Sequence, residues 1–265
     1  MYDTPTTYRP EGCLEAACAE PLDAPSVTLR DLLQHAGAAP HYDSGLTDPV
    51  PPEALRNDPE YNTGIAWALP FWVDQPAINV PGTTYHYSTM GYNLAGAAVE
   101  SAGGAPLGAL VAEHIATPLG MTTLQTDPWW EPIPDRAVGY WLDDGRLAED
   151  GDTDVSWKLP GGGFLSTGED LTRWCAGLLT DAVLPRGVRD DVLWTPTGPS
   201  DSYALGFGAD RSPGARVISH SGSQEKAKTA VLWYPDEGLC FTVMSNTRDA
   251  DPWALVAVLE GAFRG

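Results

Sequence analysis

The chain has 265 residues, a formal net charge of −21 and 43% apolar residues. This length is enough for one large domain or two modest ones with a substantial core. The negative charge repels nucleic acid and anionic lipid, which excludes both as expected partners, and no apolar run is long enough to span a bilayer. The same acidity is typical of a solvated surface and fits either a halophile or a high-GC bacterium.

Residues 1–26 are polar, rich in proline and weakly periodic, which predicts a lead-in segment. The first five residues have neither a basic start nor an apolar stretch, so the sequence shows no signal peptide. Localisation therefore stays undetermined, with the cell envelope or the extracellular space plausible if an N-terminal part is missing.

Four cysteines give two different expectations. Cys13 and Cys18 are close in sequence and are candidates for a local disulfide in an exported protein. Cys175 and Cys240 lie in apolar surroundings and are expected to be plain core residues.

Residues 27–200 are predicted to form a mostly helical region. Thr28 and Asp31 form a capping-box-like start of a helix that ends near Gly37. Loops are expected over 40–63. The other predicted elements are a short helical segment over 64–73, helices after Ser88, over 106–117 and after Thr167, a hairpin over 136–150 and a glycine-rich turn over 160–165.

From about residue 203 the apolar period changes to two. Strands are predicted over 203–209, 216–221, 227–234 and 239–245, followed by an amphipathic helix over 252–263. Strands joined by short turns and then a helix indicate an antiparallel sheet with a helix on its face. We expect an α/β fold of the α+β type, in which residues 201–265 and residues 27–200 form one structural unit.

Two short motifs indicate the chemistry. Tyr87, Ser88 and Thr89 follow a Pro-Gly turn at the start of a helix, where a tyrosine can face a cleft and transfer protons. The second motif, from His220 to Gly222, lies in the β-rich stretch.

Five elements in order resemble the serine beta-lactamase / penicillin-binding-protein superfamily. These elements are the segments at 27–35, 114–121, 160–171, 219–223 and 244–246. The segment at 219–223 contains the second motif, and the Tyr87 motif adds to the resemblance. The Tyr-Ser-Thr form is most similar to the LACTB-like serine hydrolases. The resemblance implies a beta-lactamase/transpeptidase-like fold and hydrolysis of an ester, amide or β-lactam through an acyl-enzyme.

The resemblance also implies roles for individual residues. Tyr87 corresponds to the proton shuttle, and the backbone N–H of Ser223 to half of the oxyanion hole. His220 stands where many relatives have a lysine. Substrate contacts are implied for Thr89, which replaces an asparagine, and for Ser221, Gly222, Gly162 and Gly163.

Other polar residues have simpler readings. The glycine run over 161–163 is either a turn or a rim that approaches substrate. His35 and His41 are expected to close hydrogen bonds near a loop. Residues 150–161 begin like a calcium loop but lack its glycine and closing glutamate, so no metal and no cofactor are expected.

The nucleophile motif of this superfamily is not where the resemblance requires it. It is a Ser-x-x-Lys at a helix N-terminus, where the helix dipole and the lysine lower the proton affinity of the serine. One Ser-x-x-Lys occurs, from Ser223 to Lys226, but it lies in a predicted turn and is interpreted as accidental. The Gly-x-Ser-x-Gly layout of other serine hydrolases is not found in the sequence.

Two hypotheses explain this pattern. Residues 3–5 and 8–10 resemble the segment that follows the nucleophile helix in relatives, so the chain is expected to begin past its nucleophile and to be inactive alone, as part of a full hydrolase. The alternative is a non-catalytic homologue that binds peptides or a partner. Missing strands would leave an exposed sheet edge, which predicts self-association through that edge or its coverage by residues 1–26.

Overall fold

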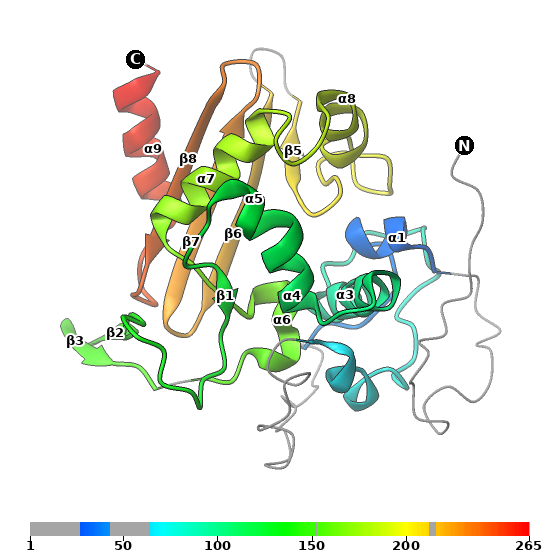
Figure 1. Ribbon diagram of the computed structural model, residues 1–265, viewed down its shortest axis with the longest axis horizontal. Coiled ribbons are helices and arrows are strands. Elements are labelled where there is room, and N and C mark those ends of the chain that lie inside the picture. Colours follow the sequence, from blue (N-terminus) through cyan, green and yellow to red (C-terminus); the bar gives the residue numbers. More distant parts are fainter. Residues whose placement is uncertain (1–26, 43–63, 152, 212–215, 265) are drawn as a thin grey trace.

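A computed structural model describes residues 27–42, 64–151, 153–211 and 216–264 (Figure 1). Its main sheet is antiparallel, in the order β5-β6-β7-β8. Helices cover both faces of this sheet, which confirms the expected α+β class. The strands are Gly208–Asp210, Val217–Gln224, Ala227–Tyr234 and Leu239–Ser245, and the covering helices are α7 (Gly168–Leu179) and α9 (Pro252–Phe263).

The alternation along β7 explains why helices cover both faces. Successive strand residues point to opposite faces of a sheet. Val231 and Trp233 pack in one buried cluster with residues of α7. Leu232 and Tyr234 pack in another with Val256 of α9. Because β7 is apolar on both faces, it can lie inside the sheet between two helices.

The helical region begins as its sequence predicts. The backbone N–H of Asp31 donates to Thr28 Oγ1 over 3.1 Å, and the Asp31 carboxylate accepts the backbone N–H of Thr28 over 3.0 Å. This capping box starts α1. The helical elements of the region are α1 (Leu29–Leu33), η3 (Ala66–Phe71), α3 (Thr89–Gly103), α4 (Leu107–Val111), η4 (Ala112–Ala116) and α5 (Thr117–Leu119).

A separate apolar cluster fills this helical region. It includes Ile65 before η3, Met90 of α3 and Leu107 of α4, all buried. Gly96 of α3 lies so close to Ile65 and Pro160 that a β-carbon there would clash. This close approach sets how near α3 lies to α6 (Leu159–Gly162), the short helix that contains Pro160 and that the sequence predicted as a turn.

Several short elements join the two parts of the fold. The pairs β1–β4 and β2–β3 are antiparallel. Their bounds, with those of the short helices, are β1 Gln125–Thr126, β4 Phe164–Leu165, β2 Tyr140–Asp143, β3 Arg146–Glu149, η5 Ser156–Lys158, α6 Leu159–Gly162, α8 Arg186–Val188 and η6 Arg189–Leu193.

Several predicted boundaries agree with the structure. Strands 227–234 and 239–245 and the helix 252–263 have the predicted bounds, and the hairpin turns at Asp144 and Gly145, which have positive φ angles. The lead-in segment 1–26, the Cys13–Cys18 pair and most of the loop 40–63 lie outside the described residues.

Three sequence predictions were wrong in detail. The predicted strand 203–209 is a strand only from Gly208. The predicted strand 216–221 continues to Gln224, because Gln224 pairs with Ala227 and leaves a two-residue connection. Ser223 therefore lies within β6, and not in a turn. The helical stretch of α8 and η6 was not predicted.

The expectation that Cys175 and Cys240 are plain core residues was also wrong. The two cysteines form a disulfide that joins α7 to β8, with Cα atoms 6.1 Å apart. Their apolar surroundings were read correctly, because Cys175 is buried and Cys240 packs against the same cluster. Sequence gave no sign of pairing, because 65 positions separate the two cysteines.

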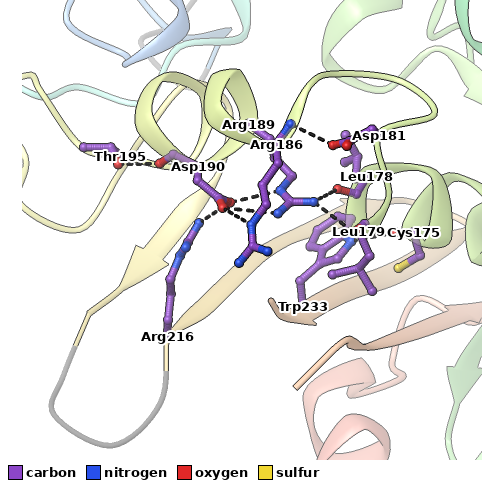
Figure 2. Close-up of polar contacts among 10 residues, drawn as sticks. All are labelled: Cys175, Leu178, Leu179, Asp181, Arg186, Arg189, Asp190, Thr195, Arg216 and Trp233. Atoms are coloured by element: carbon purple, nitrogen blue, oxygen red, sulfur yellow. Dashed lines mark hydrogen bonds and ion pairs between the residues drawn. The ribbon is translucent and has the colours of Figure 1, made fainter. Parts of the chain in front are cut away.

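A charged network ties the C-terminus of α7 to η6 and to Arg216, the residue before β6 (Figure 2). The guanidinium of Arg189 donates to the carbonyl oxygens of Leu178 and Leu179 over 2.8 and 2.9 Å, which satisfies acceptors that a helix end leaves without partners. Asp190 accepts hydrogen bonds from Arg189 and from Arg216, at 2.9 and 2.8 Å. Arg189 is buried, so these bonds replace the water that it loses.

Among the described residues, no single helix is long and apolar enough to cross a membrane. The pair formed by α3 and the helix over Leu107–Leu119 meets the length and composition criteria only together, with a 75° bend between them.

We predict that the Cys175–Cys240 bond contributes strongly to stability. Closing a loop of this length is expected to contribute about 4 kcal/mol, mainly through the unfolded chain. Reductant should therefore lower the urea midpoint of the wild-type protein. A Cys175→Ala/Cys240→Ala variant should start at the lower midpoint and show no response to reductant. An unchanged wild-type midpoint under reductant would contradict a structural role of the bond.

A second prediction concerns Asp190. Burial raises its pKa, but hydrogen bonds from Arg189 and Arg216 outweigh burial and lower the pKa from 3.8 to about 2. The resulting stabilisation is present above pH 3.8 and is lost as the pH falls through about 2. Asp190→Asn should cost about 2 kcal/mol at neutral pH, and the difference from wild type should vanish in acid. Urea unfolding at several pH values across this range measures the free energy of unfolding of each variant. Asp191→Asn, at an exposed position, is the control. An equal loss of stability in both variants would refute the role of the network.

Candidate active site

The start of α3 places Tyr87 beside a capped helix end. Ser88 is the N-cap, and its Oγ accepts the N–H of Gly91 over 2.9 Å. The same hydroxyl donates to the carbonyl oxygen of Pro40 over 2.6 Å. Serine is a favoured N-cap because its hydroxyl satisfies a free N–H of the first turn. Tyr87 precedes the cap and is 40% exposed, so its ring is accessible from solvent.

Rings from remote segments surround the Tyr87 motif. The ring centroids of four tyrosines lie within 6 Å of the centroid of the buried His35 imidazole. Its Nε2 lies 3.1 Å from Tyr203 Oη. The Tyr203 ring is in turn 6.5 Å from the ring of His220 on β6. The four tyrosines are Tyr85, Tyr87, Tyr92 and Tyr203, so this ring cluster spans from α3 to the sheet.

Burial makes this cluster electrically neutral. Burial, together with smaller effects of the nearby His220 and His41, lowers the pKa of His35 to about 3. Burial also lowers the pKa of His220. The pKa of Tyr87 is raised, first by burial and then by Tyr85 and Tyr42. At neutral pH the imidazole of His35 and the phenol of Tyr87 are therefore uncharged.

The second motif lies on β6, which includes Gly222 because the strand continues to Gln224. His220 pairs with Val231 and Ser221 with Ala230 of β7, and Ser221 and Gly222 are exposed. Ser223 is directly opposite Lys228, and its Oγ accepts a hydrogen bond from the Lys228 ammonium. The side chain of Ser223 is thus held by a cross-strand neighbour.

The glycine element contacts the first motif and the end of β6. A β-carbon at Gly161 would clash with the methyl group of Thr89, and the Gly162 carbonyl accepts a hydrogen bond from the Gln224 side chain over 3.2 Å. Gly162 has a φ of +152°, which favours glycine. Gly163 is buried, donates to Leu159 and accepts from Asp127 through its backbone. The element therefore lies between the start of α3 and the end of β6.

The structure also shows where the Ser-x-x-Lys falls. Ser223 belongs to β6, and Lys226 lies in the connection before β7, with its side chain against Gly139. Serine and lysine three positions apart share a face on a helix but not on a strand. This geometry does not provide the helix-borne nucleophile that the chemistry requires. Within the described residues no cluster of His, Cys, Asp or Glu could hold a metal ion.

Sequence reasoning missed part of this arrangement. Tyr85 could have been found, because it stands two residues before Tyr87, and the rings of both tyrosines contact His35. Tyr203 and Gln224 gave no comparable signal. Tyr203 contacts His35, from which 168 positions separate it in the sequence. Gln224 was predicted to lie in a turn.

Comparison with known proteins gives the same scaffold. Residues 8–259 match the Beta-lactamase family. The chain is 24% identical over 268 residues to Unguisins hydrolase ungD′ of Aspergillus campestris, covering 89% of this chain and 46% of that protein. It is 25% identical over 201 residues to the human mitochondrial serine beta-lactamase-like protein LACTB, covering 64% of this chain and 36% of that protein. The chain spans less than half of the length of each relative.

Solved structures agree at the level of fold. A penicillin binding protein from Bacillus halodurans superposes with a TM-score of 0.72 at 23% identity, over 91% of this chain and 75% of that one. A D-stereospecific amidohydrolase from Streptomyces superposes with a TM-score of 0.68 at 20% identity, over 89% of this chain and 72% of that one. An octameric penicillin-binding protein homologue from Pyrococcus abyssi superposes with a TM-score of 0.68 at 22% identity, over 88% of this chain and 56% of that one. With a family match that covers nearly the whole sequence, the chain belongs to the Beta-lactamase family.

Proposed function

We propose that the chain carries the proton-shuttle and substrate-binding parts of a serine hydrolase of the beta-lactamase, DD-peptidase or esterase type. The observation that supports this is the ring cluster, in which His35 contacts Tyr87 and reaches His220 on β6 through Tyr203. Tyr87 is the proposed shuttle, and the N–H of Ser223 is half of the proposed oxyanion hole. Thr89, Ser221, Gly222, Gly162 and Gly163 are the proposed substrate contacts.

The proposed reaction passes through an acyl-enzyme. In a full hydrolase, a serine Oγ attacks the carbonyl carbon of an ester, amide or β-lactam and passes its proton to the Tyr87 oxygen, which must be a phenolate beside a cation in order to accept it. The leaving oxygen or nitrogen takes a proton as its bond breaks, and water then hydrolyses the serine ester. Backbone N–H groups stabilise the oxyanion that forms on the carbonyl oxygen.

We further propose that the 265-residue chain does not perform this reaction alone. Its Ser-x-x-Lys lies on β6 and its connection to β7, and burial keeps the Tyr87 phenol protonated at neutral pH. Loss of a serine nucleophile in a comparable unit costs on the order of a millionfold in turnover. The location of the Ser-x-x-Lys on β6 and its connection also favours an alternative function, a non-catalytic module that binds peptides or a partner.

Covalent labelling tests the inactivity of the chain. Neither a fluorescent penicillin nor a fluorophosphonate should label the purified protein, because both report an activated serine. Mass spectrometry of the treated protein would detect a modified peptide. Labelling at Ser223, or at any other serine of this chain, would refute the proposal.

The coding DNA upstream of Met1 separates the hydrolase from the binding module. An in-frame Ser-x-x-Lys on an amphipathic helix favours the hydrolase, and a stop codon close upstream favours the module. In a longer protein of the first kind, Tyr87→Phe should slow labelling by roughly 10²- to 10⁴-fold, as expected for a lost proton-transfer group. Tyr140→Phe on β2 is the matched control.

The edge of the sheet supports a proposal about assembly. Within the described residues β8 pairs with β7 alone, so its other edge is a site for a strand of a second copy. Met244 of β8 is 40% exposed. The relation of residues 27–200 to 201–265 as one structural unit is likewise proposed, supported by the disulfide from α7 to β8.

Sedimentation measures this self-association. Salt should strengthen it, because screening weakens repulsion between chains of charge −21. Met244→Lys should shift the protein to monomer by placing a charge on the edge strand, whereas Val188→Lys at an exposed site on α8 should not. A wild-type protein that stays monomeric at high salt would contradict the proposed interface.

A further inference from the structure

Two imidazoles accept the first N–H groups at the start of α3. The N–H of Ser88 donates to Nδ1 of His35 over 3.0 Å, and the N–H of Thr89 donates to Nδ1 of His41 over 3.2 Å. The first N–H groups of a helix have no partner within the helix. Both histidines come from the segment after α1, about 50 positions earlier in the chain. Remote side chains therefore complete the N-terminal cap that Ser88 begins.

The hydrogen bonds define the state of His35. A ring nitrogen that accepts an N–H must have a free lone pair, so in the neutral ring the proton is on Nε2. That Nε2 lies 3.1 Å from Tyr203 Oη and donates to it. Only 3% of His35 is exposed, and burial lowers its pKa to about 3. The acceptor at Nδ1 is therefore present throughout the neutral range.

The same two rings flank the phenol of Tyr87. The His35 centroid is 4.0 Å from the Tyr87 centroid, with the planes tilted by 38°. His41 approaches edge-on, at 5.6 Å and 81°. One pair of side chains thus contacts the ring of Tyr87 and holds the two backbone N–H groups that follow it.

We propose that His35 and His41 are positioning residues, which together fix the backbone after Tyr87 and the direction of its phenol ring. This inference rests on the proposed role of Tyr87 as the proton shuttle. A proton-transfer group must lie within hydrogen-bond reach of its target, so rotation of the phenol away from the site would remove its function.

Other bonds hold the two segments together when one imidazole is removed. Ser88 Oγ donates to the Pro40 carbonyl over 2.6 Å, and the N–H of His86 donates to the His35 carbonyl over 2.7 Å. These bonds use atoms that a change of the His35 or His41 side chain leaves in place. Substitution of either histidine therefore removes a positioning contact while the segments stay in register.

Asparagine is the conservative variant at both positions. Its amide oxygen is an acceptor close to the place of an imidazole Nδ1. His35 has a φ of +55°, a left-handed conformation that asparagine tolerates well. Alanine keeps the β-carbon but has no acceptor, so at His41, which is not among the residues of positive φ, comparing His→Ala with His→Asn isolates the hydrogen bond from the ring contact. At His35 the alanine variant also bears the cost of the left-handed conformation, so the His41 pair gives the cleaner comparison.

Amide hydrogen exchange followed by NMR tests the proposal on the full chain without substrate. His35→Ala should speed exchange of the Ser88 N–H on the order of tenfold, and His41→Ala should do so for Thr89. His35→Asn and His41→Asn should restore slow exchange. In all four variants the ring signals of Tyr87 should shift, because its ring neighbours change. Exposed His114→Ala is the control and should alter neither amide.

Two results would overturn the inference. One is unchanged exchange of Ser88 and Thr89 in folded alanine variants. The other is failure of asparagine to restore slow exchange in a protein whose urea midpoint equals that of wild type. If His35→Ala does not fold, His35→Asn and the His41 pair decide the question. Because no substrate is used, a failed inference leaves the labelling tests of Tyr87 unaffected, and a failed labelling test leaves the exchange result standing.

Discussion

The first N–H groups of α3 have no acceptor within the helix, and the candidate site depends on the side chains that supply one. Ser88 satisfies one of them locally, and the imidazoles of His35 and His41 satisfy two more from a distant segment. Those histidines follow α1, whose start is fixed by the capping box of Thr28. Hydrogen bonds between the segment after α1 and the start of α3 therefore hold the backbone that follows Tyr87.

This way of holding Tyr87 has an electrostatic consequence. A phenol becomes a useful base when a neighbouring cation lowers its pKa. Its ring contacts here are imidazoles, and burial keeps that of His35 neutral, while burial and nearby tyrosines raise the phenol pKa. Lys228 is engaged by Ser223 across the β6–β7 ladder. These contacts support the proposed orienting of the Tyr87 phenol, and ionising that phenol would require a positive charge close by.

Local signals carried the sequence analysis furthest. The capping box at Thr28 and the predicted bounds of β7 each depend on residues a few positions apart, and each agrees with the structure. The Cys175–Cys240 bond and the contact between His35 and Tyr203 join residues far apart in the chain. Neither leaves a periodic or compositional trace, so both required the folded arrangement.

The extension of β6 changes the reason for interpreting the Ser-x-x-Lys as accidental, because Ser223 lies in a strand and not in the predicted turn. On a helix, Ser223 and Lys226 would stand one turn apart on one face, where the ammonium could act on the hydroxyl. On a strand the neighbour of a residue is the one across the ladder, and Lys228 takes that place. A match to the Beta-lactamase family over residues 8–259 and a Ser-x-x-Lys without its helix are therefore compatible. The fold depends on burial patterns spread over the chain, whereas the nucleophile depends on one pair of side chains in one secondary structure.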